Sequence, residues 1–153
     1  MAMNNKICVQ QQDFDLASEY HNLTINNPDD GAVVTFVGLV RDFNQDGKIT
    51  GLFLEHYPAM TIKALTSIVQ QAREKWTLGR ITIIHRVGQL NPTDQIVFVG
   101  VTSQHRQAAY QANEFIMDYL KTRAPFWKKE TSKQGDSWVE AKQTDREKAD
   151  RWQ

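Results

Sequence analysis

The chain has 153 residues, of which 18 are basic, 18 are acidic and one, Cys8, is a cysteine. This length fits one domain with its own core, and the balanced charge excludes a general attraction to nucleic acid or anionic membranes. A single cysteine excludes an internal disulfide, a CxxC redox pair and a cysteine-rich zinc site. The first residues lack the apolar run of a secretory signal, and no stretch approaches the roughly 20 apolar residues of a membrane span. We therefore expect a single domain over 1–153, with a charged tail at about 143–153, in the cytoplasm.

Stretches with strand and helix periodicity alternate along the chain. The predicted elements, in order, are a strand at 6–11, a helix at 13–23, strands at 32–40 and 49–57, a helix at 60–76, strands at 80–87 and 95–101, a helix from 103 to about 124, and a short strand at 137–141. Asp46-Gly47 is a hairpin turn signal, so we expect the strands on either side of it to pair antiparallel. The strands at 80–87 and 95–101 form a second expected hairpin. Two hairpins, each followed by a long helix, predict an α+β fold in which two long helices cover a mixed or antiparallel sheet.

The last long helix carries charge at its start. Ser103 or Thr102 is expected to cap it, and Pro125 is expected to end it. His105 and Arg106 fall in the first turn, where backbone N–H groups favour an anion and a cation is unfavourable. Two cationic side chains there are easier to explain if an anion binds between them. The alternative is an exposed pair without a role.

A basic cluster follows at the end of the same helix. Five cations stand against the single acid Glu130, and they are Lys121, Arg123, Lys128, Lys129 and Lys133. Such a concentration suits a phosphate or carboxylate ligand, although Lys121 and Arg123 could merely complement the helix dipole while the later lysines are solvated. A lysine shielded from water among other cations has a lowered pKa and can accept a proton or act as a nucleophile. Lys121 fits that description best.

Metal and nucleotide signatures are absent from the sequence. There is no GxGxxG, P-loop, HExxH or GxSxG motif, and the four histidines, which are His21, His56, His85 and His105, show no ligand spacing. Cys8 has no flanking basic residue, so it is expected to be a packing residue. We expect no metal and no cofactor.

Four segments carry a family resemblance, and they are GAVVTFVGLVR, LEHYPAM, SQHR and FIMDYLKTRAPFWKKE. Together they resemble the large, catalytic subunit of molybdopterin synthase, from about Asp30 to Trp138. The resemblance implies a sulfurtransferase of molybdenum-cofactor biosynthesis, which inserts two sulfurs into cyclic pyranopterin monophosphate (precursor Z) to make molybdopterin. It also implies a partner, a small ubiquitin-like subunit whose C-terminal Gly-Gly thiocarboxylate supplies the sulfur.

The resemblance assigns roles to the basic cluster. Lys121 looks like the catalytic lysine beside the incoming tail, and Lys128 looks like its partner. Lys129 and Glu130 look like further residues of the surface that the tail contacts. Whether Lys121 acts as base, acid or transient acyl acceptor stays open.

The resemblance also implies a pocket for the substrate phosphate. His105 and Arg106, with Arg41 at the end of the first long strand, look like its anion-binding residues. Leu39 and Val40 belong to the same substrate-contact segment, Leu39 through its backbone alone. Lys142 stands where some relatives have arginine, and lysine lacks the bidentate geometry of that residue.

Helix length places a constraint on this site. His105 and Lys121 are 16 residues apart, so a continuous helix separates them by about 24 Å. One small pocket cannot hold both from the same chain. We therefore predict a homodimer in which each site combines Lys121 and Lys128 of one chain with His105 and Arg106 of the other, and a heterotetramer once two small subunits bind.

Two other functions compete with the enzyme. One is a non-catalytic adaptor that binds a ubiquitin-like Gly-Gly tail. The other is a single-stranded nucleic-acid binder that uses the cations with Phe126 and Trp127 as stacking surfaces. Zero net charge disfavours nucleic acid, and we expect neither a nucleic-acid nor a membrane partner.

Overall fold

The computed structural model describes residues 4–41, 49–124, 126–132, 135–139 and 143–152. Within these ranges the chain forms two four-stranded sheets and four helices. In chain order the elements are β1 (Asn5–Gln10), α1 (Leu16–Thr24), β2 (Ala32–Leu39), β3 (Ile49–His56), α2 (Pro58–Lys75), β4 (Ile81–Arg86), β5 (Gly88–Leu90), β6 (Gln95–Ser103), α3 (Arg106–Arg123), β7 (Phe126–Ser132), β8 (Gly135–Val139) and α4 (Gln143–Asp150).

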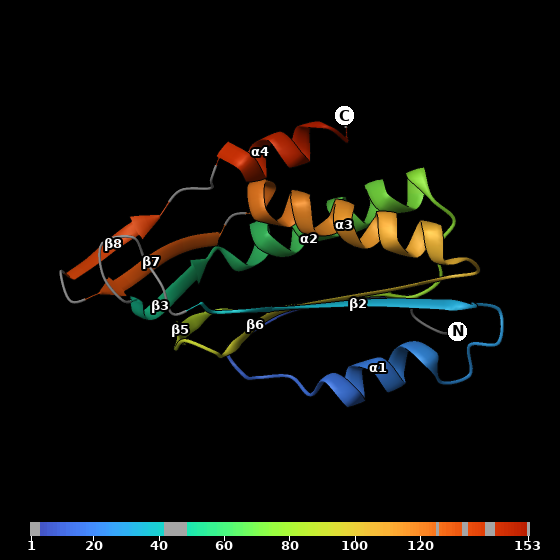
Figure 1. Cartoon of the computed structure of the whole chain (residues 1–153), viewed down its shortest axis with the longest axis horizontal. Coiled ribbons are helices and arrows are strands. Elements are labelled where there is room, and N and C mark those ends of the chain that lie inside the picture. Colours follow the sequence, from blue (N-terminus) through green and yellow to red (C-terminus); the bar gives the residue numbers. More distant parts are fainter. Residues whose placement is uncertain (1–3, 42–48, 125, 133–134, 140–142, 153) are drawn as a thin grey trace.

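The first sheet forms the middle layer of the molecule (Figure 1). Its strand order is β1-β4-β6-β2, with β1 parallel to β4 and the other neighbours antiparallel. Helix α1 covers one face, and α2 and α3 cover the other (Figure 1). Because both faces are covered, adjacent residues of β4 such as Ile83 and Ile84 are both buried. The largest core cluster lies between this sheet and α2 and α3.

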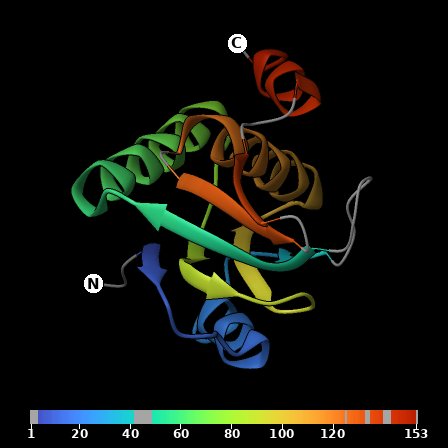
Figure 2. The same ribbon diagram turned by 90° about the vertical axis from the view of Figure 1, so that its left-hand side faces the viewer.

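The second sheet is antiparallel, with the order β5-β3-β7-β8. Figures 1 and 2 show it at one end of the molecule, beyond the end of the first sheet. A buried apolar cluster joins the two sheets, and its members are Val40, Leu52, Leu54, Val87 and Leu90. The end of β2 is therefore packed directly against the second sheet.

The predicted α+β class is confirmed, but the predicted hairpin of strands 32–40 and 49–57 is wrong. In the structure β2 pairs with β6, whereas β3 pairs with β5 and β7. A turn sequence favours only local pairing, whereas pairing with β6 lets Val33 and Val37 pack on the cluster beneath α1. Asp46-Gly47 lies outside the described residues. The other predicted pair, β4 with β6, is antiparallel as expected.

The predicted cap of α3 is also wrong. Thr102 and Ser103 belong to β6, and His105 is the N-cap residue. The two hydroxyls are engaged elsewhere, since Thr102 Oγ1 donates to Asp30 at 2.8 Å and Ser103 Oγ donates to the Thr77 carbonyl at 2.9 Å. They tie β6 to neighbouring loops instead of capping the helix.

The charged tail is packed more closely than its composition suggests. Ala149 of α4 is buried, and the Trp152 ring meets Trp76 and Phe115 edge-on, with centroids 5.7 Å apart in both pairs. Trp152 Nε1 donates to Asp118 of α3 at 2.7 Å, and Arg151 donates to the same carboxylate at 3.2 Å. A buried carboxylate therefore holds the tail on α3.

None of the helices in the described part of the chain is both long and apolar enough to cross a membrane.

We expect Asp118→Ala to lower the free energy of unfolding by about 1–3 kcal/mol, because it leaves the half-buried Trp152 N–H without its acceptor. Glu114→Ala is the matched control, since Glu114 is exposed and pairs with the same Arg151. An exposed pair is worth at most about 1 kcal/mol. Urea unfolding measures both variants, and equal losses would contradict a buried anchor for the tail.

The cap of α1 predicts a pH effect. The Asp15 carboxylate accepts from the Ser18 hydroxyl and the Ser18 N–H, and these bonds hold the pKa of Asp15 below its ordinary 3.8. A lowered folded-state pKa stabilises the fold above the unfolded pKa, and this contribution is lost as pH falls through the folded value. Asp15→Ala should therefore lower Tm at pH 7 and lower it less below about pH 4.

Asp15→Asn is the control for this effect, because asparagine keeps the capping oxygen and does not titrate. Its Tm at pH 7 should lie between those of Asp15→Ala and the wild type, because asparagine keeps the capping bond and lacks the charge. Thermal unfolding at pH 3 to pH 7 measures the Tm of each protein. If Asp15→Ala lowers Tm by the same amount at pH 7 and pH 3, the carboxylate charge has no part in the cap.

Candidate functional site

Helix α3 carries charged residues at both of its ends. Its inner side is buried on the first sheet, where the Asn113 side chain donates to the carbonyl groups of Val34 at 3.1 Å and Val99 at 2.9 Å. With 18 residues, the helix is about 27 Å long. His105 and Arg106 at its start and Lys121 in its last turn are all exposed. These side chains are therefore far apart within one chain.

The start of α3 is open to an anion. His105 has an extended backbone, with φ −128° and ψ 149°, and makes no side-chain capping bond, while the first turn contains no acidic residue. The first turn itself therefore supplies no carboxylate to its N–H groups, and Arg106 adds a positive charge beside them. This arrangement suits phosphate or carboxylate.

Leu39, Val40 and Arg41 lie at the opposite end of the first sheet from His105. In the β2–β6 ladder Ala32 faces Ser103, just before α3, whereas Leu39 faces Gln95. An eight-residue strand spans about 25 Å. Arg41 is thus on the Lys121 side of the molecule, and no pocket of a single chain combines it with His105 and Arg106.

The three residues of this segment differ in exposure. Leu39 is 55% exposed and Val40 is 6% exposed. The Val40 N–H donates to the Asp94 carbonyl at 2.9 Å, and its carbonyl accepts from the Thr93 N–H at 2.8 Å. Arg41 follows as an exposed residue. Since both backbone groups of Val40 are engaged, Val40 fixes the direction in which Arg41 leaves the sheet.

Lys128, Lys129 and Glu130 lie in β7, which the sequence analysis did not predict as a strand. Their backbones pair with Leu54, Phe53 and Leu52 of β3, in that order. Phe126 at the start of β7 packs on the cluster that contains Val40 and Leu54. The strand that carries Lys128 therefore starts beside the end of β2. Lys142 lies outside the described residues.

The structure thus divides the candidate residues into two groups. Leu39, Val40, Arg41, Lys121 and the segment 128–130 belong to the end that carries the second sheet, and His105 with Arg106 belongs to the far end of α3. One contact at the same end of the molecule has no sequence signal: the ring of His85 stacks on Phe126. These residues are distant in the sequence, and only the fold brings them together.

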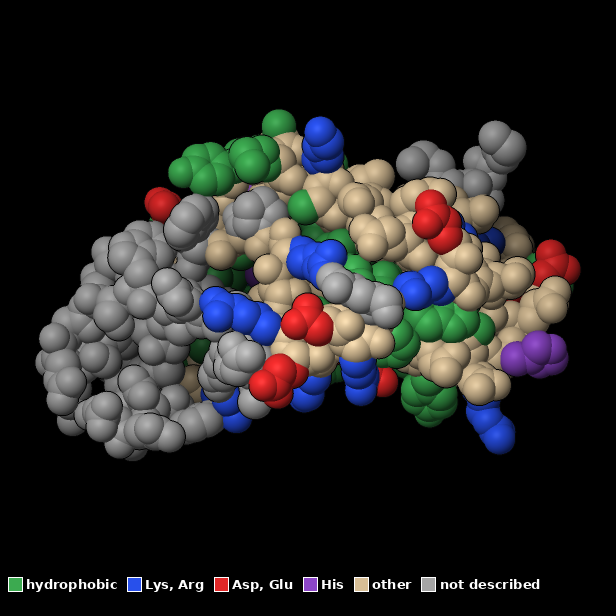
Figure 3. Space-filling model, turned by 90° about the horizontal axis from the view of Figure 1, so that it is seen from above, with side chains coloured by type: hydrophobic (Ala, Val, Ile, Leu, Met, Phe, Trp, Pro, Cys, Tyr) green, Lys and Arg blue, Asp and Glu red, His purple; other side chains and the backbone are tan. Residues whose placement is uncertain are grey.

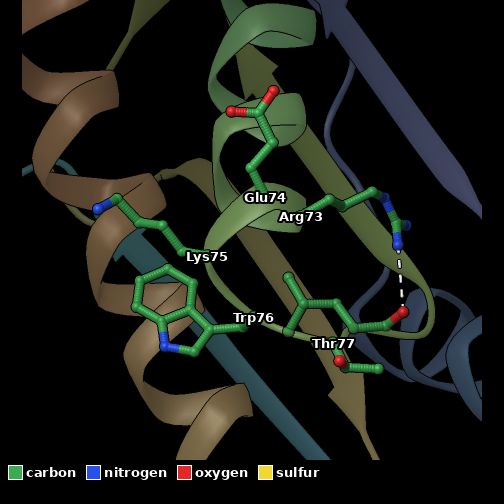
Figure 4. A pocket seen from close by; sticks show the side chains of 6 residues that line it. Arg73, Glu74, Lys75, Trp76 and Thr77 are labelled. Carbon is green, nitrogen blue, oxygen red and sulfur yellow. Dashed lines mark hydrogen bonds between the residues drawn. The ribbon is translucent and has the colours of Figure 1, made fainter.

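A hollow of about 370 Å³ lies elsewhere, at the end of α2, lined by residues 73–78 (Figure 4). Arg73 donates to Oδ1 of Asn5 in β1 and to the carbonyl groups of Asn4, Leu78 and Gly79. These bonds tie the end of α2 to β1, so the guanidinium has a structural role. In the part of the chain that the structure describes, no three metal-binding side chains come together.

Comparison with known proteins identifies the class of this chain. The model of the MoaE protein family matches residues 9–123. The molybdopterin synthase catalytic subunit of Escherichia coli K12 is 56% identical over 147 residues, which is 96% of this chain and 97% of that protein. The corresponding subunit of Yersinia pestis is 53% identical over 152 residues, covering 99% of this chain and all of the relative.

Solved structures agree with this assignment. The molybdopterin biosynthesis MoaE protein of Burkholderia ambifaria superposes with a TM-score of 0.83 at 47% identity, covering 97% of both chains. Molybdopterin synthase from Staphylococcus aureus gives a TM-score of 0.79 at 36% identity, covering 86% of this chain and 94% of that one. The fold and these matches define an enzyme class, the molybdopterin synthases. The chain belongs to the MoaE protein family, and the predicted enzyme class is confirmed.

Proposed function

We propose that this chain converts cyclic pyranopterin monophosphate to molybdopterin, taking two sulfurs, one from each of two thiocarboxylated tails of a small ubiquitin-like subunit. The observation that supports this most is the match of nearly the whole chain to molybdopterin synthase catalytic subunits at more than half identity. The whole chain acts in this proposal as a single domain of the cytoplasm.

The chemistry needs positive charge and a proton at one place. A thiocarboxylate sulfur attacks a pyranopterin carbon and oxygen leaves, and water then cleaves the acyl C–S bond so that the tail departs as a carboxylate. The site must therefore protonate the leaving oxygen and balance the negative charge that develops. Lys121, exposed in the last turn of α3, donates to that oxygen. Lys128 on β7 is the partner of Lys121 in this step. Lys129 and Glu130 belong to the surface along which the tail lies.

The substrate phosphate is held by a second set of residues. His105, Arg106 and the first-turn N–H groups of α3 form a cationic end that suits a phosphate. Arg41, directed by the engaged backbone of Val40, reaches the same ligand from the other side, and Leu39 contributes its backbone.

These two sets meet only if two chains share a site. Because α3 is about 27 Å long, the phosphate end of one chain must approach the lysine end of another. A two-fold dimer does this twice, which gives two equivalent sites. With one small subunit at each site, the assembly is a heterotetramer.

A small-subunit partner fits the structural relatives. A structure of the complex of subunits 1 and 2 of molybdopterin-converting factor from Helicobacter pylori shares this fold, with a TM-score of 0.69 at 20% identity. A complex of two different subunits is likewise proposed for this chain.

The competing nucleic-acid binder has less support. Among the described residues, Figure 3 shows acidic and basic side chains interspersed over the helical face. Single-stranded nucleic acid requires a positively charged groove along its backbone. The adaptor alternative is decided by the first of the two experiments below.

Lys121→Ala should lower the rate of molybdopterin formation at least about 100-fold, the usual effect of losing a positioned proton donor. Its affinity for the small subunit should change little. Lys63→Ala is the matched control, because Lys63 is an exposed lysine of α2. The assay supplies precursor Z and the thiocarboxylated small subunit and measures dithiolene product. Unchanged product formation by Lys121→Ala would remove the role proposed for Lys121, whereas a folded wild type that binds the small subunit and forms no product would support a non-catalytic adaptor.

Mixing inactive His105→Ala and Lys121→Ala chains should restore activity. With random exchange, half of the dimers are mixed and each contains one intact site, so activity should reach about one quarter of the wild-type level. Native mass spectrometry confirms that mixed dimers form. Mixed dimers without activity would disprove the shared site.

A further inference from the structure

A histidine stacks on the first residue of β7. The rings of His85 and Phe126 have centroids 3.9 Å apart and planes inclined by 17°. The ring of His56, whose backbone pairs with that of Phe126, lies further away at 6.4 Å. Phe126 is thus held by one close stack and one looser contact, both with imidazole rings.

His85 occupies a place where the strand pattern calls for an apolar residue. It follows Ile81 and Ile83 at every second position of β4, and both of these isoleucines belong to the core cluster beneath α2 and α3. His85 itself is only 5% exposed. Its Nδ1 is 2.8 Å from the Arg86 carbonyl, a contact in which the ring N–H donates. A buried polar ring has a cost that leucine at the same place would not have.

Phe126 marks the point at which the chain changes direction between the two lysines. Helix α3 ends at Arg123, Ala124 is extended with φ −78° and ψ 135°, and the Phe126 N–H donates to the Ala124 carbonyl at 2.9 Å. Lys121 lies before this bend and Lys128 lies after it. The position of Phe126 therefore governs how the start of β7 is set relative to the last turn of α3.

The first sheet supplies the fixed reference for this bend. Arg86, next to His85, donates from Nε to the Gln11 carbonyl at 3.1 Å and from a terminal nitrogen to the Gln95 carbonyl at 2.8 Å. These bonds anchor the end of β4 to the segment after β1 and to β6. Phe126 thus stacks on a residue whose own backbone is held in place.

We infer that His85 is a positioning residue for sulfur transfer. Its ring holds Phe126 in place, and this keeps the start of β7, which carries Lys128, in a fixed position relative to Lys121 at the end of α3. This inference rests on the proposed function for its catalytic consequence. His85 does not touch the reacting atoms in this account. Its contribution is geometric, and displacement of a catalytic group by about 1 Å costs on the order of 100-fold in rate.

The test compares two substitutions at one position. His85→Phe keeps a flat ring over Phe126, and His85→Leu has similar bulk without a ring. Both lose the bond to the Arg86 carbonyl, so their difference reports the stack alone. We expect kcat for molybdopterin formation to fall about 10- to 100-fold in His85→Leu and to stay within about threefold of the wild type in His85→Phe. The KM for precursor Z should change little in either, because neither substitution removes a residue proposed to bind the phosphate.

A second aromatic pair provides the control for general loss of stability. Phe14 packs on Phe98 across the other face of the first sheet, with centroids 5.7 Å apart, beneath α1 and away from the lysines. Phe14→Leu should lower Tm and leave the kcat of the folded protein unchanged. An equal fall in kcat for Phe14→Leu and His85→Leu would mean that destabilisation alone explains the effect.

Hydrogen exchange separates this inference from the proposed function. Amides of the β7–β3 ladder should exchange at least about tenfold faster in His85→Leu than in the wild type, with the β1–β4 ladder unchanged, and His85→Phe should behave like the wild type. If the wild type forms no product, the proposed function fails and the exchange data alone decide on the stack. Wild-type exchange in His85→Leu, or the same damage in both variants, would overturn the inference.

Discussion

The rigid length of α3 is the constraint on which the rest of this structure depends. The helix is pinned to the first sheet by a continuous apolar face and by the two bonds of Asn113 to β2 and β6. It can neither bend nor slide without breaking buried hydrogen bonds. Residues at its two ends therefore keep a fixed separation, and a ligand that needs both ends must lie between two molecules.

The second sheet and one end of this helix together form the proposed binding surface for the tail. Strand β7 of this sheet begins three residues after α3 ends, and the cluster of Val40, Leu52 and Leu54 packs it against the end of β2. The same junction contains the stack of His85 on Phe126. Three segments that are remote in the sequence thus meet where Lys121 is exposed, and the stability of this junction determines the geometry of the lysines.

Local patterns were sufficient for α1, α2 and α3 and for most strands. The apolar spacing of α3 predicted its buried face, and the motif DYLKTRAP placed Lys121 near its end. The partner of each strand was not predictable in this way, because the turn signal at Asp46-Gly47 describes only its neighbours while β2 pairs with β6, more than 50 residues along the chain. Strand β7 was missed for the same reason, since its sequence FWKKETS is largely charged and polar and its partner β3 is distant. The register of β2 also separates Arg41 from His105, which sequence motifs alone had grouped.

The most direct measurement is a structure of the chain bound to its small subunit and to a pterin phosphate. The account predicts that one ligand contacts Lys121 of one protomer and both His105 and Arg106 of the other, with the phosphate at the start of α3. A ligand whose phosphate and reacting carbon are both held by residues of a single protomer would contradict it.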